Sequence, residues 1–502
     1  MKTHKIFFIL ILAIVLRFLF IGTMPALNPD EAALGYNAYS LLKTGKDEHG
    51  SSWPIHFKSF GDYKPGGYVY LALPFIKILG LTPLATRLPN LILSILTIYY
   101  FYLLINQLSK NDNLAALSAL ILTISPWYLH FSRGAWEAGA ALAFTVIGTY
   151  CFFKNQKYLF ILFFSLSLYT YHSARLITPL LAIILIILNY KIEIRNWKKW
   201  LLPIVFGIII CLPVLFSFLH QGGASRLNGV GLAADKGPLN RAEELLNQHG
   251  NTKIFNRIIH NKRVLYLLSW GQKYASHFNP NFLFINGDEV PRSKVPEMGL
   301  LYLIELPLLI YGFYQSKKRN QLNLLMFSWL LIAPIASSLT FQAPSALRSL
   351  PMVVPLSYFI AVGIINTQKV YPPEGGRAIY CLLIAIYLFS FAYYLDAYYR
   401  HYQKRWPFAW NYGFAQIVPY VESQKNQYDH IFFTNKFDQP YILYLFFSQY
   451  PPAQLQPQIK LTPPDQYGFS TVDQIDNITF HIPPEKDIPP HSLVISDKML
   501  LP

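Results

Sequence analysis

The chain has 502 residues, of which 53% are hydrophobic and only 14% are charged. A soluble protein of this length carries nearer a quarter charged residues, and here the apolar residues gather in blocks of about 17–22, the length that crosses ~30 Å of hydrocarbon. The formal net charge of +16 does not indicate nucleic-acid binding, because many Lys and Arg residues fall in short turns between these blocks, as the positive-inside bias produces. The composition therefore excludes an ordinary soluble protein and predicts a membrane protein.

About eleven apolar blocks are long enough to be predicted as membrane spans. If successive spans cross the membrane in alternating directions, the basic turns between them all fall on one side. The positive-inside bias assigns that side to the cytoplasm. The short apolar segment 66–81 carries Lys77 and would reverse this parity if it spanned, so we expect it to lie as an interfacial or re-entrant helix on the outer surface. The predicted spans are 5–24, 87–108, 114–131, 137–153, 157–172, 174–190, 201–219, 298–315, 322–341, 348–366 and 378–399.

The last hundred residues have a different composition. Strand-like runs at 431–434, 478–482 and 492–496 alternate with helical stretches at 410–424 and 441–448, and this alternation predicts a small α/β domain. The expected fold class is thus an α-helical polytopic membrane protein with a small C-terminal extracytoplasmic α/β domain. The predicted membrane domain comprises residues 1–399 and includes two large outer loops at 25–86 and 220–297. The predicted α/β domain comprises residues 400–502.

Polar residues near the outer ends of the spans are the candidates for function, because a transporter would more often place its binding groups near the midplane. Asn28-Pro29-Asp30-Glu31 follows the first span directly. Pro29 suits a first helical turn and Asn28 can cap it. Asp30 and Glu31 then either stabilise the positive end of that helix or supply a general base that deprotonates an acceptor hydroxyl.

The next cluster, Gly61-Asp62-Tyr63-Lys64, lies in the same outer loop. Lys64 is a compact positive charge able to hold a phosphate, with Asp62 and Tyr63 in support; the alternative is an ordinary turn with a solvated lysine. Upstream, Asp47-Glu48-His49 has metal-ligand residue types, but consecutive residues seldom converge on one ion, so we expect a solvated turn there.

Two further outer turns carry charge. Arg133 and Glu137 are four residues apart and form either a helical ion pair or part of the site. His172 and Arg175 follow a short span of about 15 residues, roughly 23 Å long, so Arg175 is expected in a recess where it faces phosphate rather than extending its charged end out to water.

Arg348, at the outer start of a late span, and Arg17, in the first span, are ranked lower. Each is either a phosphate contact or a structural ion-pair partner. Together these clusters place carboxylates and cations at one membrane depth, which is the inventory for glycosyl transfer from a polyprenyl-phosphate sugar. The cations would neutralise the departing phosphate and a carboxylate would deprotonate the acceptor in a single, inverting displacement.

The stretches NPDEAALGYNAYSLLKTGKD, DYKPGG and RLPNLILSIL resemble the glycosyltransferase C superfamily, specifically protein O-mannosyltransferases and bacterial lipid A aminoarabinose transferases, over roughly residues 1–400. The resemblance implies a glycosyltransferase C-type fold. It also implies that Asp30 is the catalytic carboxylate with Glu31 beside it, that Lys64 contacts the lipid phosphate, and that Arg133 and Glu137 form a second outer-turn motif. Such enzymes use dolichyl or undecaprenyl phosphate sugars and do not strictly need a metal.

The expected function is therefore transfer of a sugar from a polyprenyl-phosphate donor to an acceptor hydroxyl, on the extracytoplasmic side of a prokaryotic plasma membrane. No cofactor is required; a divalent metal is possible but not indicated. The outer loop 220–297 matches neither subfamily, so the acceptor stays open among protein, lipid and glycan. The alternatives are a transporter or lipid-sugar flippase, and a non-catalytic scaffold that presents the tail to partners.

Overall fold

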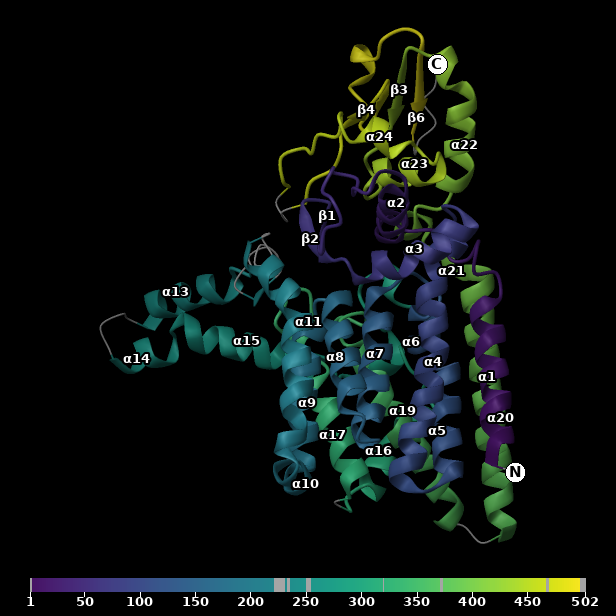
Figure 1. Cartoon of the computed structure of the whole chain (residues 1–502), viewed down its shortest axis with the longest axis vertical. Helices are drawn as coiled ribbons and strands as arrows, with labels where there is room; N and C mark the ends of the chain where they lie inside the picture. Colours follow the sequence, from purple (N-terminus) through teal and green to yellow (C-terminus); the bar gives the residue numbers. More distant parts are fainter. Residues whose placement is uncertain are drawn as a thin grey trace.

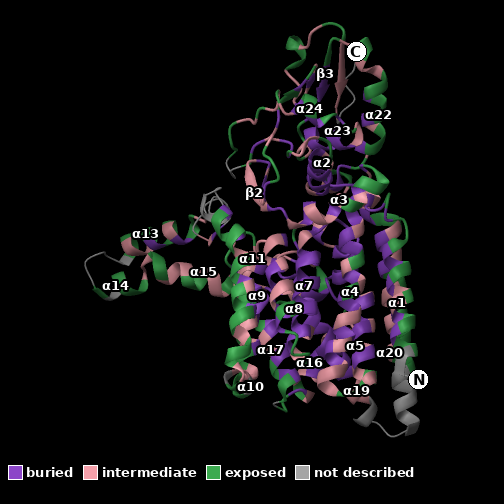
Figure 2. Ribbon diagram, in the orientation of Figure 1, coloured by how far each residue is buried: buried purple, intermediate pink, exposed green. Residues whose placement is uncertain are grey.

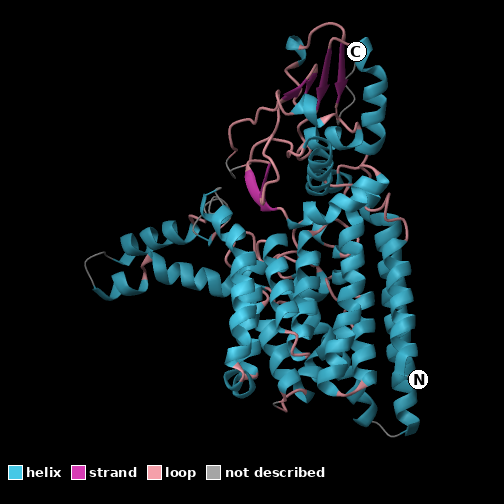
Figure 3. Ribbon diagram, in the orientation of Figure 1, coloured by secondary structure: helices cyan, strands magenta, loops and turns pink. Residues whose placement is uncertain are grey.

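A bundle of long helices carries a smaller α/β module at one end, and a helical arm projects sideways from it (Figure 1). The computed structural model describes residues 2–220, 231–232, 235–249, 254–318, 320–370, 373–465 and 469–496. Figure 3 shows that helix dominates the bundle, whereas strands occur in the module and in one hairpin beneath it.

Each of the eleven predicted spans contains a helix, although 298–304 and 19–24 lie outside it. Within the described residues, five helices are long and apolar enough to cross a membrane by length and composition, and shorter apolar helices pack among them. The bundle helices are α1 (Lys2–Phe18), α4 (Pro83–Ser109), α5 (Asp112–Ile124) continued by α6 (Pro126–Phe131), α7 (Glu137–Phe153), α8 (Lys157–Thr170), α9 (Ala174–Leu188), α11 (Leu201–His220), α16 (Glu305–Gln315), α17 (Gln321–Ile332) followed by α18 (Ile335–Ser338), α19 (Val353–Val370) and α20 (Pro373–Asp396).

The basic turns lie together at the end opposite the α/β module. Lys5 pairs with Asp112 at 3.6 Å, and Lys110 and Lys154 line one shared hollow. The N-terminus and α10 (Tyr190–Arg195) lie at this same end in Figure 1. The alternation predicted from the basic turns is therefore present in the fold, and the large loops all gather at the other end, which we call the cavity end.

The first loop at the cavity end is built from α2 (Pro29–Thr44), a two-stranded hairpin and α3 (Gly67–Leu79). Asn28 caps α2 in a capping box with Glu31, and Pro29 is its first residue, as the sequence predicted. The short apolar helix α3 lies beside α2 at the end of the bundle rather than through it (Figure 1), so the expected interfacial placement fits the fold.

The hairpin pairs β1 (His56–Ser59) with β2 (Asp62–Pro65) in antiparallel register. Phe60 and Gly61 form its two-residue turn with φ of 55° and 83°. Two successive positive φ values match the twist of the flanking strands in a tight hairpin, and glycine meets this requirement without steric cost. The turn at 47–49 differs from expectation: Asp47 and Glu48 are fully buried rather than solvated, because Asn37 and the local backbone bind them.

The C-terminal module is a four-stranded sheet in the order β4-β5-β3-β6, in which β3 pairs in parallel with both neighbours. All three predicted strand runs and both predicted helices are found. The module shares one hydrophobic core with α2 and α3, visible as continuous burial in Figure 2. Its elements are α22 (Phe414–Gln424), β3 (His430–Phe433), α23 (Pro440–Phe447), α24 (Pro452–Leu455), β4 (Gln474–Ile475), β5 (Ile478–Thr479) and β6 (Ser492–Ile495); α21 (Tyr402–Arg405) links it to α20.

The helical arm comprises α13 (Gly237–His249), α14 (Ile254–Ile259) and α15 (Lys262–Ser276). It belongs to the outer loop predicted at 220–297, part of which lies outside the described residues. The arm leaves the bundle beside α11 near the cavity end (Figure 1). Asp235 joins its two longer helices, because its carboxylate pairs with Lys273 at 2.9 Å and its carbonyl accepts from the Tyr266 hydroxyl.

Candidate active site

A cavity of about 420 Å³ lies where the cavity end of the bundle meets the first loop and the C-terminal module. Segments far apart in the sequence supply its walls: the start of α2, the β1–β2 hairpin, the start of α7, the α8–α9 turn, the segments 290–293 and 341–348, and the module. The charged and polar lining residues are Asp30, Asp62, Lys64, Glu137, Tyr171, His172, Arg292, Ser293, Gln342, Ser345, Arg348, Asp438, Gln439 and Asp465.

Asp30 is the carboxylate at the centre of the charged groups in this cavity. Its Oδ1 lies 2.5 Å from Lys64 Nζ, and its Oδ2 lies 3.7 Å from Arg292 Nη2. Arg292 also lies 3.9 Å from Asp438, which belongs to the module. The Asp30 side chain is 31% exposed, so a substrate can reach it. A carboxylate flanked by two cations can exchange those cations with a phosphate.

The hairpin explains which residues of the second sequence cluster reach the cavity. Side chains alternate between the two faces of a strand, and Asp62 and Lys64 both line the cavity, whereas Tyr63 between them does not. Lys64 Nζ also lies 5.0 Å from the centre of the Phe60 ring. The hairpin therefore presents one carboxylate and one cationic side chain to the cavity, and Tyr63 faces away.

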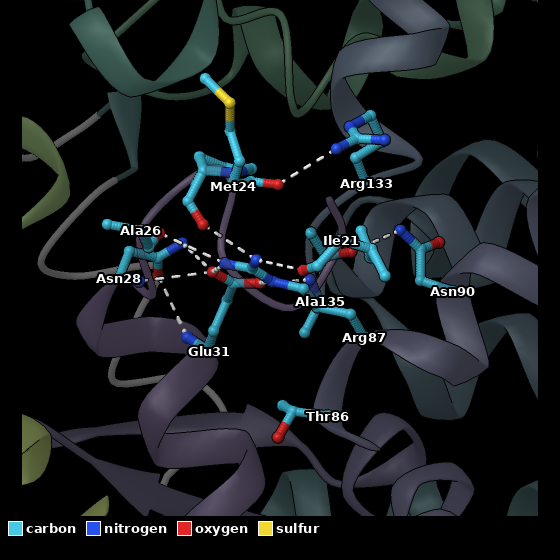
Figure 4. Close-up of polar contacts among 12 residues, drawn as sticks. Ile21, Met24, Ala26, Asn28, Glu31, Thr86, Arg87, Asn90, Arg133 and Ala135 are labelled. Carbon is cyan, nitrogen blue, oxygen red and sulfur yellow. Dashed lines mark hydrogen bonds and ion pairs between the residues drawn. The ribbon is translucent and has the colours of Figure 1, made fainter. Parts of the chain in front are cut away.

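Glu31 lies next to Asp30 but is turned into the protein (Figure 4). It is 1% exposed, and both carboxylate oxygens accept from Arg87, from Nε and from Nη2, each at 2.8 Å. The amide of Asn28 and the backbone N–H of Ala135 donate to it as well, at 3.1 and 2.7 Å. Glu31 thus joins α2 to α4 and to the turn before α7, and it does not line the cavity.

Arg133 and Arg17 are also fully buried and lie outside the cavity. The Arg133 guanidinium donates to four backbone carbonyls, those of Leu16, Arg17, Leu19 and Met24, at 2.6–3.2 Å; Figure 4 shows the bond to Met24. Arg17 donates to Ser94 Oγ at 3.0 Å. Both guanidinium groups hold the end of α1 in place, and the geometry gives neither a route to a phosphate in the cavity.

Arg175 contacts the hairpin rather than the cavity. Its Nη2 lies 2.6 Å from His56 Nε2, and its Nε donates to the Leu168 carbonyl at 3.1 Å. Burial, and then the charge of Arg175, lower the pKa of His56 to about 4. His56 is therefore neutral at pH 7 and can accept from Arg175, so the pair fixes the strand opposite Lys64 to the start of α9.

Arg348, His172 and Glu137 do line the cavity. Arg348 Nη1 donates to the Gln342 carbonyl at 2.9 Å and to Thr340 Oγ1 at 3.2 Å. Together with Tyr171 and Leu347, Arg348 also lines a narrow apolar crevice that runs between α7 and α9. The cavity therefore has a basic group beside a small apolar hollow of about 20 Å³.

Sequence reasoning missed Arg292 and Asp438. Arg292 falls in the outer loop that matched no known motif, and Asp438 falls in the tail that was predicted as a separate domain. Nothing local singles out Arg292 among the ten Lys and Arg residues of the outer loop at 220–297. No local pattern marks Asp438, because it reaches the cavity only through the docking of the module.

No protein-family model and no curated protein sequence matches the chain, but its fold matches solved structures. ArnT from Cupriavidus metallidurans in the apo state aligns over 89% of this chain and 84% of its own, with a TM-score of 0.53 and 10% identity. The same protein bound to undecaprenyl phosphate gives the same score at 12% identity.

The oligosaccharyltransferase of Archaeoglobus fulgidus in the apo form aligns over 89% of this chain and 64% of its own, with a TM-score of 0.50 and 12% identity. At these identities the match concerns the fold. The chain has the glycosyltransferase C-type fold, as the sequence resemblance implied.

Proposed function

We propose that this chain, a polytopic membrane protein with the glycosyltransferase C-type fold, is a glycosyltransferase that moves a sugar from a polyprenyl-phosphate donor to an acceptor hydroxyl. The observation that carries the proposal is Asp30, an accessible carboxylate in a cavity at the end of the bundle, with Lys64 and Arg292 on either side. The fold match to an ArnT structure bound to undecaprenyl phosphate supports a lipid phosphate as the donor.

In the proposed mechanism the donor phosphate binds Lys64 and Arg292, and Arg348 adds a third cation to the lining of the same cavity. The arriving phosphate takes the two cations from Asp30 and leaves that carboxylate as the general base. Asp30 accepts the proton of the acceptor hydroxyl, whose oxygen attacks the anomeric carbon. The bond between that carbon and the phosphate oxygen breaks with its electron pair on the phosphate, so the configuration inverts. The cations that stabilise the negative charge on the departing phosphate are expected to make the largest electrostatic contribution to catalysis.

We place the reaction on the extracytoplasmic side of a prokaryotic plasma membrane, because the basic turns lie at the end opposite the cavity. We further expect turnover without a metal. Among the described residues no group of three or more His, Cys, Asp or Glu side chains is arranged to hold an ion. Activity that survives EDTA treatment would support this expectation, and loss of activity restored by a divalent ion would contradict it.

The test compares Asp30→Asn, Lys64→Ala and Arg292→Ala with the wild type. Mass spectrometry of glycans and glycolipids from cells carrying each variant measures transfer, and we expect Asp30→Asn to reduce it by about 10²–10⁴-fold, the usual contribution of a general base. Near-normal product in that variant would refute the assignment of Asp30 as the base.

Binding of undecaprenyl phosphate to the purified variants separates the two roles. Lys64→Ala and Arg292→Ala should each weaken binding by about 10–100-fold, since hydrogen bonds to charged groups contribute ~1.5–3 kcal/mol, whereas Asp30→Asn should not weaken it. Tyr63→Ala is the matched control, because that residue lies on the opposite face of the same strand. Equal effects at Tyr63 and Lys64 would move the phosphate site elsewhere.

A further inference from the structure

The arm formed by α13, α14 and α15 exposes large apolar side chains away from the rest of the molecule. Ile254 is 75% exposed, Ile258 59%, Leu267 63% and Leu268 56%. Side chains of this size and exposure on one extension mark a surface that is covered by something else. The structure of the arm and its position on the bundle indicate what covers it.

The arm has two layers of different character. In Figure 1, α13 lies on the side of the α/β module and α15 on the side of the bundle's middle. The described α13 exposes Arg241, Glu243 and Glu244, as a helix in water does. The apolar side chains belong to α14 and α15 instead. A helical hairpin in which one helix exposes charged side chains and the other helices expose large apolar ones has the pattern of an element that lies in a membrane interface.

The root of the arm lies at the depth where the spanning helices end. The Tyr274 hydroxyl donates to the Leu331 carbonyl at 2.8 Å, and His277 Nε2 lies 2.7 Å from Ser337 Oγ. Leu331 is at the cavity end of α17 and is itself 54% exposed, so the bundle still presents apolar surface to lipid at this level. The arm therefore projects sideways from the bundle at the level where α17 ends.

The charges of the lower layer are of one sign. Residues 254–276 contain Arg257, Lys262, Arg263 and Lys273 and no Asp or Glu, whereas both glutamates of the arm are on α13. Cations beside an apolar face match phosphate headgroups, and each contributes about 1 kcal/mol near an anionic surface.

We propose that the arm lies on the leaflet at the cavity end, with the apolar face of α14 and α15 among the acyl chains and with Arg257, Lys262 and Arg263 against anionic headgroups. The chain that leaves α15 continues through the π-helical turn Asn281–Ile285 to Arg292 in the cavity. Seating the arm at the membrane surface thus fixes the level of that wall of the cavity. This proposal concerns a lipid surface and does not depend on the reaction proposed above.

The test places a nitroxide label on Leu268→Cys or Glu243→Cys in full-length protein whose three native cysteines have been replaced, reconstituted in nanodiscs with a mixture of neutral and anionic phospholipid. Collision rates with oxygen, which concentrates in hydrocarbon, and with a water-soluble nickel chelate report the depth of each label. We expect the ratio of oxygen to nickel collisions to be at least about fivefold higher at 268 than at 243. Free access of nickel to both labels would place the arm in water and overturn the proposal.

A label at 268 that neither reagent reaches would mean that protein, such as a second copy of the chain, covers this face, and it too would overturn the proposal. The charge component is tested with the triple variant Arg257→Glu/Lys262→Glu/Arg263→Glu, with Arg241→Glu on the polar layer as control. The triple variant should lose the dependence of the 268 signal on the anionic lipid fraction, and the control should keep it. A wild-type signal that is the same in neutral and anionic nanodiscs would contradict headgroup recognition.

Discussion

Asp30 and Glu31 are adjacent, and their side chains have opposite surroundings. Asp30 is at the second position of α2 and opens onto the cavity, whereas Glu31 is one residue further and turns back onto its own cap and onto Arg87. Successive residues of a helix point about 100° apart, so one of two neighbouring carboxylates can face substrate only if the other faces the protein. The α2 cap thus positions the proposed base through its neighbour.

Glu31→Gln should therefore damage the fold rather than the chemistry. The substitution leaves the buried Arg87 guanidinium without its negative partner, and breaking a buried pair in this way costs about 3–5 kcal/mol. We expect a lower unfolding temperature of the purified protein in detergent and a lower yield. Asp30→Asn serves as the control and should unfold near the wild-type temperature. Unchanged stability in Glu31→Gln would show that the network contributes little.

The arginines follow the same logic. Arg175 was predicted to face phosphate, and Arg133 and Arg17 were each given a phosphate contact or a structural pairing as alternatives. The fold binds Arg133 to the end of α1, Arg17 to Ser94 and Arg175 to His56. A guanidinium carries five donors, so it can satisfy several carbonyls where the chain turns at a membrane boundary. Sequence position therefore selected both the residues that line the cavity and the residues that hold the chain together. Only the direction of each side chain in the fold separates the two groups.

At the scale of elements, α16 and α19 cross with almost no space between their backbones. A Cβ added at Gly312 would lie 1.9 Å from the Phe359 carbonyl oxygen, and one at Gly363 would lie 2.0 Å from that of Leu308. Small residues allow such close approach between helices in a membrane.

Gly312→Ala should force these helices apart and destabilise the bundle by about 1–3 kcal/mol, the usual cost of overpacking. Thermal unfolding in detergent measures the effect. Gly271→Ala is the matched control, because a Cβ there meets nothing within 4 Å and alanine is the better helix former. If both variants unfold at the same temperature, the crossing is not as tight as the structure indicates.

The buried turn after α2 should make stability depend on pH. Burial raises the pKa of Glu48 to about 8, against the stabilising hydrogen bond from Asn37. The folded protein therefore keeps a proton that the unfolded chain releases above its ordinary pKa of 4.5. The free energy of unfolding then falls as pH rises from about 4.5 to about 8, and it levels off above that.

Glu48→Gln removes this titration. We expect the unfolding temperature of the variant to decline less than that of the wild type between pH 5 and pH 8. Glu243→Gln, at an exposed position of α13, should follow the wild-type curve. A wild-type curve that stays flat over this range would mean that Glu48 is ionised in the folded protein.

For the whole molecule, the decisive feature is that the C-terminal module completes the cavity. Tyr36 of α2 donates its hydroxyl to the Tyr450 carbonyl at 2.9 Å, and Gln456 bonds to Ser40, Thr44 and the Asp47 carbonyl. These contacts join the module to the first loop, and Asp438 and Gln439 of the module line the same cavity as Lys64.

Asp438→Asn should lower transfer without unfolding the protein, because it removes one of the two carboxylates near Arg292. We expect the apparent KM for donor to rise severalfold and kcat to fall by less, as measured by initial rates of product formation. Asp429→Asn, exposed in the same module, is the control. Equal kinetics for Asp438→Asn and the wild type would leave the module with no part in the reaction.

The sequence by itself determined the spans, the end at which the large loops gather, the cap of α2 and the strands of the module. These features depend on apolar length, on turn charge and on contacts within a few residues, so local pattern is enough. It also selected Asp30, Asp62, Lys64, Glu137, His172 and Arg348, and all six line the cavity.

Only the tertiary structure decided which charged side chains face the cavity and which are buried in ion pairs and hydrogen bonds within the protein. Glu31 is turned away by Arg87, 56 residues further along the chain, and Arg292 and Asp438 reach the cavity from a loop and a module that carry no local mark. Burying a charge requires a partner, and that partner comes from distant chain. Which charged residues line the cavity was therefore fixed by packing, which no local sequence pattern contains.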